Sequence, residues 1–197
     1  QLLTAFDSDV ARHVEDDLRA GGAEVRLGDG VAGLDAEGGR VTAVRTLSGD
    51  RLLADLVLIA LGVRPNVALA TGAGIRLGET GAIAVDAQQR TSIENVFAAG
   101  DCCEALHLVT GRPVYVPLGT TANKQGRVAG TVIAGRRAAF PGIVGTAVVK
   151  ARNVSVARTG LTERQAKDMG FDAAAAVIEG KDRAATYPGA RPIYVKR

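Results

Sequence analysis

The sequence is poor in aromatic residues and has no long apolar run. Aromatic residues make up 4% of its 197 residues, whereas 47% are hydrophobic and 25 residues are glycine. The core must therefore be built from small and branched aliphatic side chains, as in a globular protein. The longest apolar run, residues 56–63 (LVLIALGV), is well below the roughly 20 residues that cross a bilayer, so no membrane helix is predicted.

A secretory signal and an excess of charge are also missing. The first residues contain no basic segment followed by an apolar one, so a cytoplasmic location is expected. The 24 basic and 21 acidic residues leave a net charge of +3, which is too small and too dispersed for a nucleic-acid-binding surface. The sequence therefore predicts neither a nucleic acid nor a membrane as a partner.

Cysteine and histidine are too few, and wrongly spaced, for several kinds of site. The only cysteines, Cys102 and Cys103, are neighbours, which suits neither a disulfide framework nor a C-x-x-C redox turn. A bridge between them would need a strained ring, so we expect both to be packing residues. His13 and His107 lack metal-ligand spacing, and no metal site is predicted.

The first third of the chain predicts one helix followed by strands. Val10, Val14 and Leu18 recur at four-residue spacing, which predicts a helix that ends at Gly21 and Gly22. We expect a strand at residues 23–28, then short antiparallel strands with tight turns over residues 31–55. Residues 56–61 are apolar at every position, which is typical of a strand buried on both faces of a parallel sheet.

Two of the predicted strands end in a glycine. Gly62 follows residues 56–61, and Gly100 closes a strand expected at residues 93–100, after another at 81–86. Ligands of open α/β sheets bind beyond the carboxyl ends of the strands, where a glycine lets the backbone approach them. At Gly62, a tight turn before the following Arg-Pro pair is an equally good explanation.

Asp101 directly follows the second of these glycines. Its carboxylate could accept hydrogen bonds from the hydroxyls of a sugar or polyol. It could also cap the start of a helix, and local chemistry alone favours that role.

The second half of the sequence predicts a long helix and then an alternation of short elements. A helical pattern covers residues 117–135, and its start, with free N–H groups and the positive end of the macrodipole, would attract negative charge. An ordinary amphipathic helix that begins at a proline is the alternative. Beyond it, Thr162 and Gln165 form the pattern of a capping box, and strands are expected at the following ranges: 146–150, 153–158, 173–179 and 192–196.

Three segments together resemble the second half of a pyridine nucleotide-disulfide oxidoreductase. They are LVLIALGVRPN (56–66), TSIENVFAAGDC (91–102) and VPLGTTANKQGRVAG (116–130). Within that superfamily, HLVTG, YVPLG, ANKQGR and YPGA are most similar to the coenzyme A-disulfide reductases and the related NADH oxidases and peroxidases.

The resemblance implies an α/β fold with three segments. Residues 1–76 would be the C-terminal part of a Rossmann-like NAD(P)H-binding domain, and residues 77–145 the second segment of a Rossmann-like FAD-binding domain. Residues 146–197 would be the N-terminal part of an α+β dimerisation domain, left incomplete. No G-x-G-x-x-G loop follows a strand in this sequence, and the family's two such loops and its redox cysteine lie N-terminal to the matching region.

The resemblance also implies the cofactors and the residues that bind them. FAD would be the cofactor, with NADH or NADPH as co-substrate. Asp101 would bind the ribityl chain, and Gly100 would allow the close approach. The remaining predicted cofactor-binding residues are Gly62, Pro117, Leu118, Gly119 and Thr120, of which the last three lie beside the pyrimidine edge of the flavin.

Tyr187 is the one candidate catalytic residue in the sequence. It lies where related enzymes often carry paired tyrosines that reach towards the active site of the partner subunit, but Thr186 precedes it here. A Y-P-G turn is the alternative.

For the complete protein we predict a homodimeric FAD-dependent oxidoreductase. Electrons would pass from NAD(P)H through flavin to a redox cysteine and then to a disulfide, peroxide or oxygen. The alternatives are a truncated binding or dimerisation module without chemistry and an electron-transfer flavoprotein similar to ferredoxin reductases. The sequence does not decide between the acceptors or between NADH and NADPH.

Overall fold

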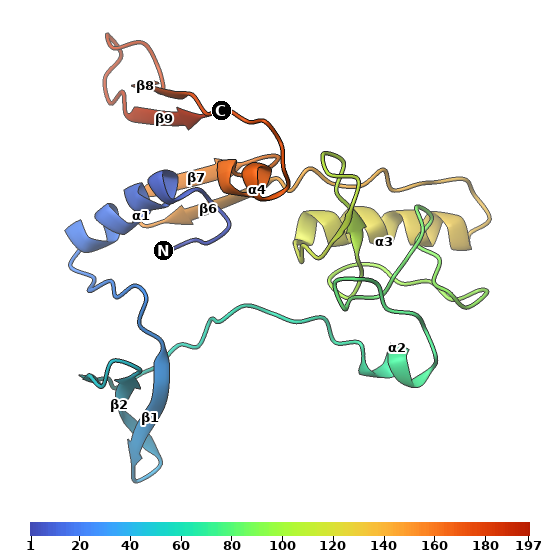
Figure 1. Ribbon diagram of the computed structural model, residues 1–197, viewed down its shortest axis with the longest axis horizontal. Coiled ribbons are helices and arrows are strands. Elements are labelled where there is room, and N and C mark those ends of the chain that lie inside the picture. The colour runs from blue at the N-terminus through green and yellow to red at the C-terminus, as the bar shows by residue number, and fades with distance from the viewer. The chain divides into compact units, whose positions relative to one another are not determined.

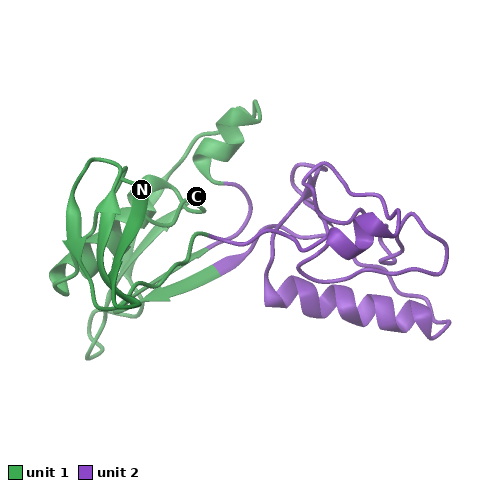
Figure 2. Ribbon diagram, turned by 90° about the horizontal axis from the view of Figure 1, so that it is seen from below, with its two compact units in different colours: residues 1–61, 148–157, 162–197 green, residues 62–147, 158–161 purple.

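The computed structural model describes all 197 residues, which form two compact units (Figure 2). Unit 1 contains residues 1–61, 148–157 and 162–197, and unit 2 contains residues 62–147 and 158–161. Each unit has its own cluster of buried apolar side chains. The two units are groups of residues in contact and do not correspond to the three predicted segments. The predicted segment boundaries near residues 76 and 145 therefore remain predictions.

Unit 1 holds most of the regular structure (Figure 1). Its helices and strands are α1 (Ser8–Ala20), β1 (Val31–Glu37), β2 (Arg40–Thr46), β3 (Arg51–Leu53), β6 (Ala147–Ala151), β7 (Val154–Arg158), α4 (Glu163–Asp168), β8 (Val177–Lys181) and β9 (Pro192–Lys196), of which β6 and β7 each reach into unit 2 by one residue. The predicted helix, the antiparallel strands over residues 31–55 and the strands at 146–150, 153–158 and 192–196 are thereby confirmed. The strand predicted at 173–179 begins only at residue 177. Helix α1 lies beside β6 and β7, because Phe6 and Val14 pack against Val156.

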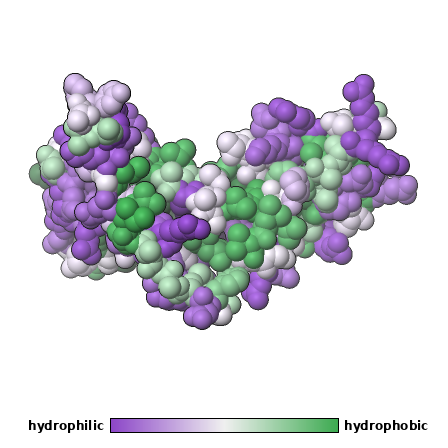
Figure 3. Space-filling view, turned by 90° about the horizontal axis from the view of Figure 1, so that it is seen from above, coloured by the Kyte–Doolittle hydropathy of each residue, from purple (hydrophilic) through white to green (hydrophobic).

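Two strand predictions in unit 1 are wrong. Residues 23–28 and residues 56–61 have no strand structure. A segment forms a strand only when neighbouring strands satisfy its N–H and C=O groups, and neither of these two segments has such a neighbour. Leu56, Leu58 and Leu61 are 85–88% exposed, so this run contributes to the hydrophobic surface of the molecule, part of which Figure 3 shows.

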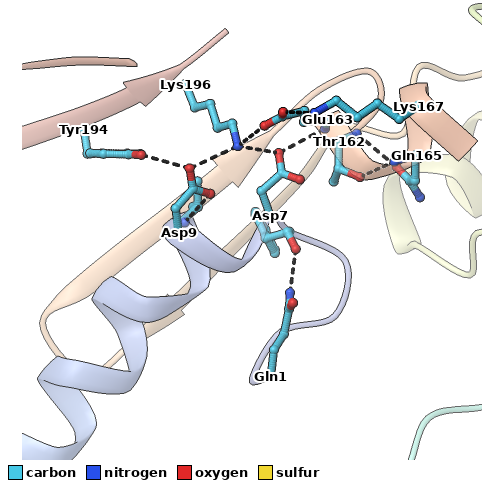
Figure 4. Close-up of polar contacts among 11 residues, drawn as sticks. Gln1, Asp7, Asp9, Thr162, Glu163, Gln165, Lys167, Tyr194 and Lys196 are labelled. Atoms are coloured by element: carbon cyan, nitrogen blue, oxygen red, sulfur yellow. Dashed lines mark hydrogen bonds and ion pairs between the residues drawn. The ribbon is translucent and has the colours of Figure 1, made fainter. Parts of the chain in front are cut away.

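A polar junction connects three elements of unit 1 (Figure 4). The Nζ atom of Lys196, in β9, lies 2.7 Å from a carboxylate oxygen of Glu163 and 3.0 Å from one of Asp9. Asp7 is 3.6 Å from the same Nζ and also accepts a hydrogen bond from the backbone N–H of Glu163. The lysine therefore holds the first turns of α1 and α4 against β9. We call Lys196 and its three carboxylates the Lys196 junction.

Helix α4 begins as its sequence predicts. Thr162 accepts a hydrogen bond from the backbone N–H of Gln165 at 3.1 Å, and the Gln165 side chain accepts one from the Thr162 N–H at 3.0 Å. The predicted capping box is confirmed, and Gly170 follows the helix with a φ of +80°.

Unit 2 contains α2 (Ala68–Gly72), β4 (Ala105–Leu106), β5 (Pro113–Val114) and α3 (Gly119–Ile133). The long helix is confirmed, whereas the strands predicted at residues 81–86 and 93–100 are reduced to isolated bridges. Ile83 pairs with Leu77 and with Cys103, so the chain there is extended without a complete ladder. Cys103 is part of the buried cluster of unit 2, in agreement with a packing role. None of the helices is both long and apolar enough to span a bilayer.

Candidate functional site

Asp101 lies in a tight turn rather than at the start of a helix. Gly100 has a φ of +88°, a conformation that favours glycine, and its C=O accepts a hydrogen bond from the Cys103 N–H at 3.0 Å. The next helix begins only at Gly119, so Asp101 does not cap one. Its side chain is exposed and available to a ligand.

The N-terminus of α3 is open to an anion. Leu118 is the N-cap residue, and no side chain accepts hydrogen bonds from the first turn. That turn contains no acidic residue, and Gly119 and Thr120 are exposed. The first N–H groups of a helix have no partner within it and lie at the positive end of its dipole. This end of α3 therefore favours a negatively charged group.

The Asp101 turn packs directly on α3. A Cβ atom at Gly100 would lie 3.5 Å from the Cβ of Ala122, which is in the first turns of the helix. The side chain of Gln125 is 1% exposed; it accepts a hydrogen bond from the Gly100 N–H at 3.0 Å and donates one to the Glu104 C=O at 3.2 Å. The sequence analysis missed Gln125, although a glutamine three residues after Ala122 on the packed side of an amphipathic helix is a usable signal.

Tyr115 adds a neutral hydroxyl near the turn. Its half-buried position raises the pKa of the hydroxyl, and the neighbouring negative charge of Asp101 raises this pKa further. The phenol therefore keeps its proton at neutral pH and remains a hydrogen-bond donor.

Two buried polar residues follow the turn. Glu104 is 8% exposed and accepts hydrogen bonds from Thr80, while His107 is 6% exposed and its Nδ1 has no hydrogen-bond partner in the structure. Burial lowers the pKa of His107, and the positive charge of Arg158 lowers it further. Neither Glu104 nor His107 was among the predicted site residues.

The other predicted residues lie in three places. Pro117 directly precedes the N-cap residue of α3 and is half-buried. Gly62 is exposed with a φ of +92°, and no atom lies within 4 Å of its missing Cβ, which fits both a ligand approach and a tight turn. Tyr187 is 65% exposed in the loop between β8 and β9, where its N–H donates to the Ala184 C=O, as in a turn. Tyr187 belongs to unit 1, and Asp101 belongs to unit 2.

A glycine–aspartate turn packed beside an uncapped helix start has the chemistry to accept hydrogen bonds from hydroxyl groups and to attract an anionic group. The family model of the pyridine nucleotide-disulphide oxidoreductases matches residues 1–126. The chain belongs to this family, and the predicted resemblance is confirmed.

Individual relatives agree with this assignment. The chain is 43% identical over 195 residues to the NAD(P)H coenzyme A polysulfide/persulfide reductase of Pyrococcus horikoshii, covering 99% of this chain and 43% of the relative. It is 36% identical over 197 residues to the NADH oxidase of Methanocaldococcus jannaschii, covering 100% of this chain and 43% of the relative. The chain thus spans less than half the length of these relatives.

A solved structure supports the fold. The NAD-dependent persulfide reductase from A. fulgidus matches with a TM-score of 0.93 and 41% identity, over 98% of this chain and 35% of that protein. The α/β fold expected from the resemblance is therefore confirmed.

Proposed function

We propose that this chain supplies part of the FAD site of an oxidoreductase that takes electrons from NADH or NADPH. The electrons then pass to a redox cysteine and finally to a small-molecule disulfide, peroxide or oxygen. The similarity to a polysulfide/persulfide reductase favours a sulfur acceptor, such as a coenzyme A disulfide or persulfide.

The observation that carries the proposal is the packing of the Gly100–Asp101 turn against α3. The Asp101 carboxylate has the chemistry to accept hydrogen bonds from the ribityl hydroxyls, and Gly100 has no side chain to obstruct them. The N–H groups at residues 118–120 face no capping side chain and suit the pyrimidine edge of a flavin, which becomes negatively charged on reduction. These residues therefore fit the cofactor.

FAD, when bound, supplies the hydride-accepting and electron-donating chemistry. The residues of this chain bind and orient it. Asp101 holds the polyol, and the α3 N-terminus stabilises negative charge on the ring system without the delivery of a proton. Tyr115 keeps its hydroxyl proton beside Asp101 and can donate it in a hydrogen bond to the same ligand.

The remaining roles belong to the same proposal. Residues 1–76 form the end of the NAD(P)H-binding domain, residues 77–145 form the second FAD-binding segment, and residues 146–197 form the start of a dimerisation domain. Gly62 then lies beside the nicotinamide nucleotide. Tyr187 reaches the active site of the partner subunit in a homodimer, for which its 65% exposure leaves it free.

FAD titrations of the protein that contains this chain test the proposal. In Asp101→Ala and Asp101→Asn variants, we expect the Kd for FAD to rise at least about tenfold, because charge-assisted hydrogen bonds are lost. Asp172→Asn, a change at an exposed aspartate outside the site, controls for the loss of a carboxylate. Unchanged FAD affinity in both Asp101 variants would contradict the assignment.

A further inference from the structure

Gln125 is among the largest fully buried side chains of the chain, and both ends of its amide are used. Its Oε1 accepts from the N–H of Gly100, and its Nε2 donates to the C=O of Glu104. Gly100 and Glu104 lie on either side of residues 101–103. One side chain of α3 is therefore bonded to the entry and to the exit of the Asp101 turn.

The two hydrogen bonds fix the distance between the Asp101 turn and α3, which the turn alone does not fix. The hydrogen bond from Cys103 to Gly100 closes the turn, but it does not tie the turn to α3. Ala122 lies 3.5 Å from where a Cβ of Gly100 would be, and its methyl group can make only an apolar, non-directional contact. The two Gln125 hydrogen bonds are the directional link that the structure shows between the Asp101 turn and the helix.

We propose that Gln125 is a positioning residue of the flavin site. It holds the Asp101 turn at one distance from the N-terminus of α3, so that the carboxylate and the helix amides meet the same FAD molecule. This inference rests on the proposed function. Gln125 itself is buried beneath the turn and acts through Asp101 rather than by touching the cofactor.

An amide is the group that this position requires. It joins one acceptor and one donor in a single planar group, which matches an N–H on one side and a C=O on the other. Leucine would leave both backbone groups buried without partners. An ionised glutamate would keep the bond to Gly100 but would place a second acceptor against the Glu104 C=O, whereas a protonated glutamic acid can again accept and donate.

The Gln125→Glu variant therefore makes the proposed role titratable. Burial and neighbouring negative charge raise the pKa of an introduced carboxyl, which places its titration nearer to neutral pH. Apart from the charges of α3 itself, the ionisable groups near the position belong to the Asp101 turn and to the residue that follows β5. These groups are Asp101, Cys102, Cys103, Glu104 and Tyr115, with Lys124 and Arg127 exposed on α3 itself.

The experiment measures the Kd for FAD at pH values from about 5 to about 8 in the protein that contains this chain. The variants are Gln125→Glu and Gln125→Leu, and Asn123→Asp is the matched amide-to-acid control at an exposed position of α3. We expect Gln125→Glu to bind FAD as the unmodified protein does near the acidic end and about tenfold more weakly near the alkaline end. Gln125→Leu should bind weakly at every pH, and Asn123→Asp should follow the unmodified protein.

Each result is decisive for one of the two claims. A Gln125→Glu variant that follows Asn123→Asp across the whole range would overturn the positioning role, while FAD binding by the unmodified protein would still support the proposed function. If the unmodified protein binds no FAD, the proposed function fails first. If Gln125→Leu does not fold, recovery of Gln125→Glu on acidification still tests the role, because that recovery requires a folded site.

Discussion

The carboxylate of Glu104 accepts two hydrogen bonds from Thr80, one from the backbone N–H and one from the hydroxyl, each of 2.7 Å. The segment that provides these donors closes tightly around the carboxylate. A Cβ atom at Gly78 would lie 1.8 Å from a carboxylate oxygen of Glu104, so a larger residue there would require the carboxylate to move. The C=O of Glu104 also accepts a hydrogen bond from Gln125. The bonds from Thr80 therefore help to fix the residue at which Gln125 holds the end of the Asp101 turn.

Gly78→Ala should destabilise unit 2. The added methyl would displace the Glu104 carboxylate from Thr80, which we expect to cost about 1–3 kcal/mol of unfolding free energy. Thermal and urea unfolding measure the change. The control is Gly72→Ala at the end of α2, where no atom lies within 4 Å of the missing Cβ and where we expect no loss. Equal stability of Gly78→Ala and the unmodified protein would contradict the steric argument.

Lys196→Met should weaken unit 1 by about 1–2 kcal/mol, because three carboxylates lose the cation between them. Lys150→Met, at an exposed position of β6, is the control for losing a lysine. Urea unfolding at neutral pH measures the difference.

The pH dependence of the Lys196 junction gives a second readout. Hydrogen bonds from Lys167 and from Lys196 lower the pKa of Glu163 below its usual 4.5. Burial opposes the shift at Asp9, yet hydrogen bonds from Lys196 and others leave its pKa below 3.8. The hydrogen bond to Glu163 raises the pKa of Lys196. The stabilisation is thus present at neutral pH and is lost as pH falls through the lowered carboxyl pKa values. Lys196→Met should therefore lose less stability than the unmodified protein on acidification to about pH 3.

His107 should make unit 2 less stable below its ordinary pKa of 6.5. Burial and then Arg158 lower the pKa of the folded imidazole, so the unfolded chain takes up a proton first as the pH falls. The stabilisation is complete above pH 6.5 and decreases as the pH falls towards the lowered value. His107→Gln should flatten the change in urea midpoint between about pH 7.5 and about pH 5. His13→Gln, on the exposed side of α1, is the control, and an unchanged slope in His107→Gln would refute the explanation.

Cys102 and Cys103 should differ in reactivity although their Sγ atoms are only 3.6 Å apart. Burial, and then the neighbouring Cys102, raises the pKa of Cys103, and its side chain is 4% exposed. We expect iodoacetamide to modify Cys102 at least about tenfold faster in the folded protein, since the thiolate is the reactive form. Peptide mass spectrometry measures the two rates, and urea should remove the difference. Equal rates in the folded state would show that Cys103 is not buried.

Local signals predicted the elements that are closed by local hydrogen bonds. The capping box at Thr162, the apolar spacing of Val10 and Val14 and the turns over residues 31–55 each specify bonds between residues near in sequence. The run at residues 56–61 carries an equally strong apolar signal and is exposed in the structure. A strand needs neighbouring strands as hydrogen-bond partners, and the sequence of the run does not predict which strands these are. Asp101 was singled out from the sequence, and its alternative role as a helix cap was excluded only when the structure showed it in a turn, with the next helix beginning at Gly119.

The sequence by itself determined the family, the positions of α1, α3 and α4, and the presence of an aspartate directly after Gly100, whereas the short helix α2 was not predicted. Only the tertiary structure decided that Gln125 bonds to both sides of that turn and that Lys196 gathers carboxylates from α1 and α4. The physical reason is that helical periodicity and capping depend on residues a few positions apart. A buried polar group instead forms hydrogen bonds with residues that can be distant in sequence and become neighbours only when the chain packs.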